Sequence, residues 1–119
     1  DEVYWLSRII NAEAGGESEK GLIAVGNVVL NRVKSKLFPN TIYGVIFDKK
    51  GGVQFEPVMN GSIYKSPSHK SISAAKKALS GVNTAGKSLY FLNPRIAQNS
   101  WIVKNRTFYK SIGNHDFYI

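Results

Sequence analysis

Residues 3–17 read VYWLSRIINAEAGGE, and this stretch predicts the first helix of the fold. Four of its residues recur three, four and three positions apart and so share one face of an α-helix: Val3, Leu6, Ile10 and Glu13. The glycine pair that follows ends the helix, so Glu13 falls in its last turn. A carboxylate on an inward face is costly unless it is paired, protonated or used chemically. Glu13 is therefore the leading candidate for a functional acid.

The position of Glu13 favours its protonated form. Apolar neighbours disfavour a charged carboxylate, and the C-terminal end of a helix is the negative end of its dipole. Both effects raise the pKa of the Glu13 carboxyl. A carboxyl that stays protonated near neutral pH is the group that general-acid cleavage of a glycosidic bond requires. The competing interpretation is an ordinary surface glutamate at the end of a helix.

Length and composition predict one domain with a single core, since the chain has 119 residues, of which 43% are hydrophobic. No apolar run reaches membrane-spanning length, and no signal peptide is visible at the first residues. The chain has no cysteine, which excludes a disulfide framework and thiolate metal sites. The two histidines, His69 and His115, lack a metal-binding spacing, so we expect neither a metal nor another cofactor.

Sixteen basic residues against eight acidic ones give a net charge of +8. This balance favours a polyanionic partner, which could be a nucleic acid, an anionic membrane surface or an anionic wall polymer. The basic residues are dispersed, and no block of five like charges occurs. A dispersed charge suits attraction to a large anionic surface better than recognition of base edges, so we expect no nucleic-acid partner.

The pattern along the chain predicts helices first and short strands later. Helices are expected over residues 1–14, 19–36 and 41–47, and over a segment that Ser71 or Ser73 caps and Gly81 ends. Strands are expected over 53–55 and 87–92, and 101–103 is expected to pair with 107–109, whereas 57–67 reads as irregular. This order is typical of an α+β domain that is mainly helical with a few short strands.

Two further carboxylates are candidates for a second acid. Common glycosidases use two carboxyls, about 5–5.5 Å apart for retention and about 6.5–9.5 Å apart for inversion. The candidates are Glu17 and Glu56. Each also has a structural interpretation, Glu17 as a favourable charge at the start of the next helix and Glu56 as a surface charge on a loop.

Aromatic residues with polar neighbours are typical of sugar binding, because a pyranose has apolar faces and a polar rim. Core packing is the competing interpretation for the aromatic side chains. Asn27, Asn31 and Arg32 cluster on the expected second helix, where Asn27 and Asn31 share a face because they lie four positions apart. These side chains either hold Glu13 or a sugar in place, or satisfy loop backbone. The candidate substrate-binding residues are Asn31, Gln54, Phe55, Tyr90, Trp101, His115 and Tyr118.

Taken in order, these motifs resemble the SleB-type cell-wall hydrolase family, the spore cortex-lytic enzymes. The resemblance covers nearly the whole chain, from residues 12–17 and 21–33 through 38–41, 45–46, Gln54-Phe55, 78–81, Tyr90-Phe91 and Trp101 to 112–118. It implies a lysozyme-like α+β fold, related to lytic transglycosylases and resuscitation-promoting factors, and action on peptidoglycan, especially the spore cortex during germination. The essential acid of the family lies in an Ala-Glu-Ala segment, which here is centred on Glu13.

From the resemblance we expect residues 1–119 to be one catalytic domain, the C-terminal part of a longer exported protein. Its expected place is extracytoplasmic, in the cell wall or the spore cortex or at the exterior of the inner membrane. We expect a monomer without a membrane span, with peptidoglycan glycan strands and an accessory spore protein as partners.

The expected reaction cleaves the β-1,4 bond between N-acetylmuramic acid and N-acetylglucosamine as a lytic transglycosylase and leaves 1,6-anhydromuramic ends. One alternative is a muramidase-type hydrolase of vegetative wall, helped by Glu17 or Glu56. The others are a wall-binding module without activity, which would use Tyr90, Trp101 and Tyr118, and a nucleic-acid-binding domain.

Overall fold

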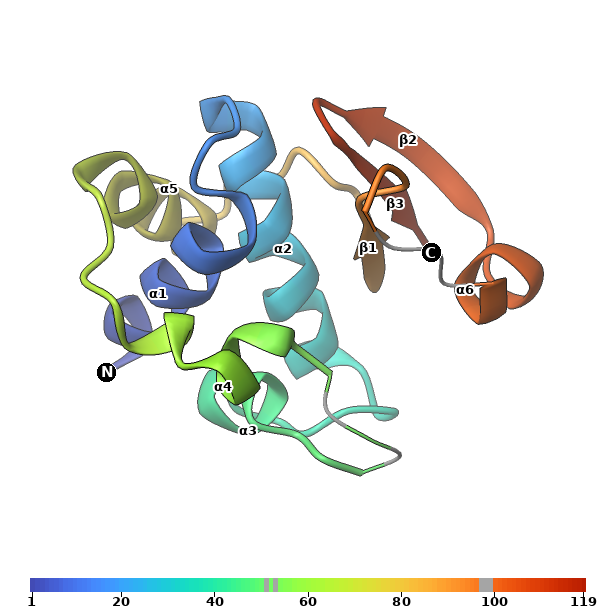
Figure 1. The fold of residues 1–119 in the computed structure, drawn as a ribbon, viewed down its shortest axis with the longest axis horizontal. Helices are drawn as coiled ribbons and strands as arrows, with labels where there is room; N and C mark the ends of the chain where they lie inside the picture. The colour runs from blue at the N-terminus through green and yellow to red at the C-terminus, as the bar shows by residue number, and fades with distance from the viewer. Residues whose placement is uncertain (51, 53, 97–99) are drawn as a thin grey trace.

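A computed structural model describes residues 1–50, 52, 54–96 and 100–119, which form a helical layer beside a small sheet (Figure 1). Within these residues no helix is long and apolar enough to cross a bilayer. The helical layer contains α1 (Glu2–Ala14), α2 (Glu19–Lys34), α3 (Ile42–Ile46), α4 (Glu56–Asn60), the 3₁₀ turn η1 (Ser62–Tyr64) and α5 (His69–Leu79). The second part contains β1 (Tyr90–Leu92), α6 (Ser100–Asn105), β2 (Phe108–Ile112) and β3 (His115–Tyr118).

Helix α2 packs against both α1 and α5 in the core, and every residue from Gly21 to Val29 is buried. Gly26 allows the close approach of its neighbours. A Cβ atom at this position would lie 3.0 Å from Ile10 Cδ1 and 3.3 Å from Ala78 Cβ. Because interiors pack at crystal-like density, a methyl group here would require Ile10 and Ala78 to shift.

Capping residues set where most of the helices begin. Asp1 accepts a hydrogen bond from the backbone N–H of Val3, Ser18 accepts one from Gly21, and Thr41 accepts one from Gly44. The predicted starts of α2 and α3 are therefore confirmed, although α2 ends at Lys34, two residues earlier than expected.

The predicted cap of α5 is wrong, because Ser68 caps this helix and neither Ser71 nor Ser73 does so. The Ser68 hydroxyl accepts from the backbone N–H of Ser71 at 3.1 Å. The hydroxyl of Ser71 donates instead to Asn11 Oδ1 at 3.0 Å, which ties α5 to α1. A contact between distant segments therefore decides which serine serves as the cap.

The sheet is antiparallel, with strand order β1-β3-β2, and the Gly113-Asn114 turn joins β2 to β3. The expected pairing of residues 101–103 with 107–109 is wrong. Residues 101–103 belong to α6, where Ile102 is buried while Trp101 and Val103 are exposed. Ile102 packs against Leu92 and Tyr118 of the sheet, and this tertiary packing overrides the strand preference of the Trp-Ile-Val sequence.

Three other predictions need correction. In the expected strand over 53–55, Val53 lies outside the described residues, Gln54 lies in a bend and Phe55 precedes α4. The segment expected to be irregular contains α4 and η1, because Pro57 suits the first turn of a helix and Gly61 ends it with a φ of 83°. The strand expected over 87–92 is shorter, at Tyr90–Leu92.

A row of polar side chains on α2 binds the backbone of residues 82–89, which leads into β1. Asn27 donates to Val82 O at 2.9 Å and accepts from Thr84 N at 2.8 Å. Further along, Asn31 donates to two carbonyl oxygens of the same loop, and Arg32 Nε donates to Leu89 O at 2.7 Å. Of the two interpretations of this pair of asparagines, the structure therefore supports satisfaction of loop backbone.

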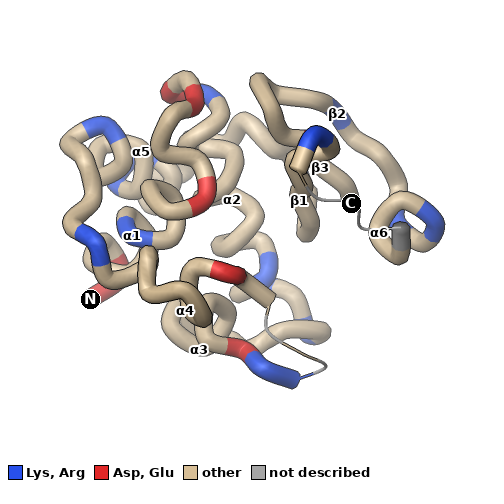
Figure 2. Tube along the Cα trace, viewed as in Figure 1, with Lys and Arg blue, Asp and Glu red and all other residues tan. Residues whose placement is uncertain are grey.

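Charge is dispersed over the molecule, as the pattern of lysines and arginines in the sequence indicates. Figure 2 shows basic positions in both the helical layer and the sheet region, without a single basic stripe. With a net charge of +8, the domain presents positive charge in many directions.

Replacement of Asn27 by alanine tests the polar row. The Asn27→Ala variant leaves the Val82 carbonyl and the Thr84 N–H without their side-chain partner, and we expect the free energy of unfolding to fall by about 1–3 kcal/mol. Urea unfolding at pH 7 measures the loss. The control is Asn40→Ala at an exposed position, where a change within about 0.5 kcal/mol is expected. Equal stabilities of the two variants would contradict this account of the loop.

Candidate active site

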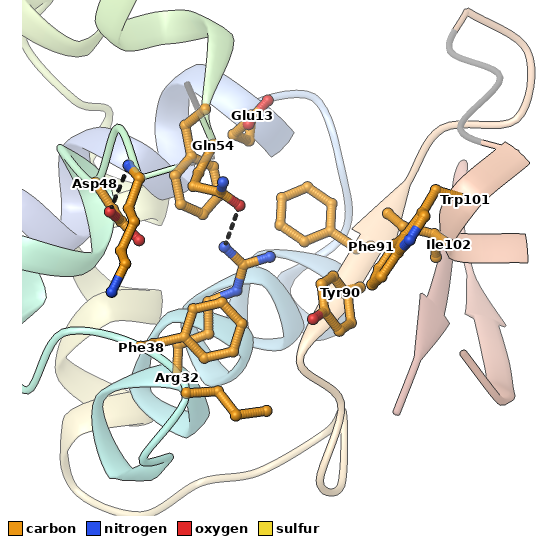
Figure 3. Close-up of a pocket in the computed structure, with 12 residues that line it drawn as sticks. Glu13, Arg32, Phe38, Asp48, Gln54, Tyr90, Phe91, Trp101 and Ile102 are labelled. Atoms are coloured by element: carbon orange, nitrogen blue, oxygen red, sulfur yellow. Dashed lines mark hydrogen bonds between the residues drawn. The ribbon is translucent and has the colours of Figure 1, made fainter. Parts of the chain in front are cut away.

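A cleft lies between the helical layer and the part of the chain that contains β1 and α6. It consists of two adjoining cavities of about 650 and 600 Å³, a size typical of ligand sites. The two cavities share four lining residues, Glu13, Gln54, Phe91 and Ile102. Figure 3 shows the first cavity, with Glu13 and Gln54 on one side and Phe91, Trp101 and Ile102 on the other. Glu13 therefore lies where the two cavities meet.

Glu13 is in the last turn of α1, at the end of the inward-facing stripe that contains Leu6 and Ile10. Both of these apolar residues are completely buried, whereas Glu13 is partly exposed at the cleft. Burial, and after it the negative charge of Glu56, raise the pKa of the Glu13 carboxyl to about 7. A carboxyl of this kind carries a proton through the weakly acidic range and can donate it to a molecule in the cleft.

Glu17 lies four residues further on and has the opposite electrostatic environment. Its carboxylate accepts the backbone N–H of Asn114 at 3.0 Å and the side-chain Nδ2 of Asn114 at 2.9 Å. The backbone hydrogen bond, more than any other cause, lowers the pKa of Glu17. Gly113 precedes Asn114 with a φ of 58°, and a Cβ atom there would overlap Glu17 Oε1. Glu17 therefore joins α1 and α2 to the turn of the β2–β3 hairpin.

The third carboxylate, Glu56, is exposed at the start of α4 and lines the second cavity together with Glu13 and Glu17. Its negative charge contributes to the raised pKa of Glu13. Among the described residues, no group of three acidic or histidine side chains is placed to hold a metal ion.

Five of the candidate substrate-binding residues line the cleft. Gln54, Phe55, Tyr90 and Trp101 line the first cavity, and Gln54 and His115 line the second. His115 is buried edge-on against Phe91, with ring centroids 5.4 Å apart. Burial lowers the pKa of the His115 imidazole, and its Nδ1 atom has no hydrogen-bond partner among the described residues.

The other two candidates lie away from the cleft lining. Asn31 uses its amide group to donate to Gly86 O and Ser88 O, at 3.0 and 2.9 Å. Tyr118 is buried with Leu92 and Ile102, because alternate residues of β3 face opposite sides of the sheet and Tyr118 faces α6. We therefore leave both residues out of the proposed substrate contacts.

The list of substrate-binding residues predicted from the sequence omits Arg32 and Phe91, which both line the first cavity. Arg32 lies in a largely apolar stretch of α2, between Val28-Val29-Leu30 and Val33. A single cation in such a stretch is the feature of the sequence that indicates a buried, functional arginine. Phe91 alternates with Tyr90 along β1, so the two rings face opposite sides of the strand while both border the first cavity. Sequence spacing alone does not place these residues opposite Glu13.

Comparison with known proteins identifies the family. The model of the cell wall hydrolase family matches residues 16–118, and the chain belongs to this family. The spore cortex-lytic enzyme of Oceanobacillus iheyensis is 37% identical over 98% of this chain, which spans only 41% of the length of that enzyme.

Two solved structures resemble the whole chain. The catalytic domain of the germination-specific lytic transglycosylase SleB from Bacillus anthracis has a TM-score of 0.90 and 36% identity, over 99% of this chain and 93% of that one. The catalytic domain of the Bacillus cereus SleB protein has a TM-score of 0.86 and 36% identity, over 99% of this chain and 89% of that one. The predicted family and the predicted mainly helical α+β fold are both confirmed.

The pH dependence of folding tests the role of Glu17. A carboxyl whose pKa is lower in the folded state stabilises the fold above its unfolded pKa, and this contribution is lost as pH falls through the folded pKa. We expect Glu17→Gln to lower the free energy of unfolding at pH 7 by about 1 kcal/mol, a small value because the site is partly solvent-exposed. Urea unfolding at a series of pH values should show the two proteins converging in acid.

The matched control is Glu19→Gln, which removes an exposed ion pair in which Lys77 Nζ lies 2.7 Å from Glu19 Oε2. This change should lower the free energy of unfolding by about 0.5 kcal/mol or less. A Glu17→Gln protein that matched the wild type at pH 7 would contradict the proposed attachment of the hairpin.

Proposed function

We propose that this domain cleaves the β-1,4 bond between N-acetylmuramic acid and N-acetylglucosamine in peptidoglycan, as a lytic transglycosylase. The observation that carries the proposal is the placement of Glu13, a carboxyl with a pKa of about 7 at the junction of two adjoining cavities. A glycan strand that occupies both cavities presents the oxygen between two sugars to this carboxyl. Aromatic rings and amide groups line the same cleft and suit the apolar faces and polar rims of sugars.

The proposed reaction uses one acid twice. Protonated Glu13 donates its proton to the bridging oxygen, the bond from that oxygen to C1 of the muramic sugar breaks, and an oxocarbenium-like centre forms at C1. N-Acetylglucosamine leaves with a hydroxyl group. Ionised Glu13 then accepts the proton of the muramic 6-hydroxyl, whose oxygen bonds to C1 and forms the 1,6-anhydro ring.

The surroundings of the other carboxylates favour this one-acid scheme over hydrolysis with two acids. Glu17 is engaged by two hydrogen bonds from Asn114, so it is poorly placed to serve as a nucleophile or base. Glu56 is exposed in the second cavity and is the residue that a muramidase mechanism would use to activate water. A muramidase that acts on vegetative wall is therefore the second candidate function.

The names of the relatives support a proposal for the biological setting. These relatives are named spore cortex-lytic enzyme and germination-specific lytic transglycosylase, so we propose that residues 1–119 act as one catalytic domain, within a longer exported protein, on the spore cortex during germination. The place of action is extracytoplasmic. We propose that the domain is a monomer whose partners are glycan strands and an accessory spore protein. Its net charge of +8 favours approach to an anionic wall polymer.

Digestion of purified cortex tests the reaction. We expect Glu13→Gln to lower the rate of muropeptide release by at least about 100-fold, because the amide cannot donate or accept the required proton. Mass spectrometry of wild-type products should find muramic ends that are lighter by one water than hydrolysis products. The control is Glu19→Gln, which should release fragments at the wild-type rate. Full activity of Glu13→Gln would end the proposal, and hydrated ends would favour the muramidase.

The pH profile of kcat/KM tests the cause of the raised pKa. Glu13 acts as an acid while it is protonated, so activity should fall as pH rises through about 7. Because the charge of Glu56 raises the pKa of Glu13, Glu56→Gln should move this alkaline midpoint to lower pH, and Glu19→Gln should leave it in place. Loss of activity of Glu56→Gln at every pH would instead identify Glu56 as a second catalytic carboxyl.

A further inference from the structure

Arg32 is a buried cation on the floor of the first cavity. It projects from α2, and only 5% of the residue is exposed. Its Nε atom donates to Leu89 O at 2.7 Å, and Nη1 lies 3.5 Å from Gln54 Oε1. Figure 3 shows the guanidinium group reaching into the cavity between Gln54 and the rings of Tyr90 and Phe91.

No carboxylate of the described residues forms an ion pair with Arg32. The ion pair that these residues do form joins Lys77 to Glu19. Aromatic rings surround the charge instead, with the guanidinium carbon 4.7 Å from the centre of Phe38 and 5.2 Å from the centres of Phe55 and Tyr90. Buried cations are normally paired with an anion, because rings replace only part of the lost hydration. Arg32 therefore keeps a large part of its charge uncompensated.

The charge persists at neutral pH and faces the cavity. Burial lowers the pKa of the Arg32 guanidinium to about 10, which still leaves it protonated under physiological conditions. Tyr90 and Asp48 line the same cavity and partly oppose this shift, Asp48 to the smaller extent. One carboxylate oxygen of Asp48 accepts the backbone N–H of Lys50 at 3.0 Å. Among the described residues, Nη2 of Arg32 has no hydrogen-bond acceptor. A planar donor of this kind suits a carboxylate.

We propose that Arg32 binds the carboxylate that the muramic sugar carries on its 3-O-lactyl substituent, directly or at the end of a short peptide. This inference rests on the proposed function, since it assigns a part of the substrate to one wall of the same cleft. The contact distinguishes muramic acid from N-acetylglucosamine, which has no such carboxylate. Arg32 therefore sets which sugar of an alternating strand occupies the first cavity.

The arrangement leaves the acid of the reaction undisturbed. The raised pKa of Glu13 arises from burial and Glu56, and the guanidinium does not cancel these effects. The bound carboxylate would thus lie in the Arg32 part of the first cavity, whereas the proton lies on Glu13 at the junction of the two cavities. Gln54 connects the two places, since it lines both cavities and accepts from Arg32.

Defined tetrasaccharides of alternating N-acetylglucosamine and N-acetylmuramic acid test this assignment. One substrate has free lactyl carboxylates, the second has them as primary amides, and the third has alanine attached so that the carboxylate lies further out. For the wild type we expect kcat/KM to be about 10- to 100-fold higher for the free acid than for the amide. If Arg32 binds the carboxylate at the end of a peptide, the alanyl substrate shows this advantage over the amide instead. Arg32→Gln should abolish this preference and Arg32→Lys should retain part of it.

The ratio between substrates separates binding from structural support, because a general loss of stability affects all substrates equally. Lys34→Gln, on the same helix and with the same change of charge, is the control and should keep the wild-type preference. An equal loss of kcat/KM on the acid and the amide in Arg32→Gln, or a wild type without preference, would overturn the assignment.

The same substrates are also titrated calorimetrically into Glu13→Gln protein. A preference for the acid in binding, with no cleavage by the wild type, would reject the proposed reaction while supporting the role of Arg32.

Discussion

The polar row on α2 is the interaction on which the rest of the structure depends. Asn27, Asn31 and Arg32 together make five hydrogen bonds with the backbone of residues 82–89. At about 0.5–1.5 kcal/mol each, these bonds are comparable to the net stability of a small domain, although their contributions are not additive. They determine where β1 begins relative to the helices. The distance between the two walls of the cleft is therefore set by one helix.

Glu13 and Glu17 show how strongly local surroundings control the ionisation of a side chain. The two carboxyls belong to the same short stretch of sequence, yet the pKa of one is raised and that of the other is lowered. Glu13 loses hydration and has no hydrogen-bond donor among the residues that the structure describes, whereas Glu17 receives two N–H groups from Asn114. Between the two pKa values, Glu13 keeps its proton while Glu17 remains charged, so one pH range suits both the acid and the attachment of the hairpin.

Features that depend on neighbouring residues could be predicted from the sequence. The end of α1 and the caps Ser18 and Thr41 follow from residues close by in the chain. The upward shift of the Glu13 pKa follows from its place on the inward face of α1, whereas the added effect of Glu56 comes from a residue distant in the sequence. The helical state of residues 101–103 and the burial of Tyr118 could not be predicted, since both depend on packing between α6 and the sheet. The place of Arg32 in the first cavity could not be predicted for the same reason, because its surroundings come from residues 54, 89 and 90.

The position of Glu13 between the cavities, rather than at the far end of either, has a consequence for how a polymer would be degraded. Sugar units would extend in both directions from the broken bond, so the enzyme would favour interior cuts over the trimming of chain termini. In a cross-linked network, a small number of interior cuts lowers the average strand length steeply. The wall would then lose mechanical stiffness well before most of its mass became soluble.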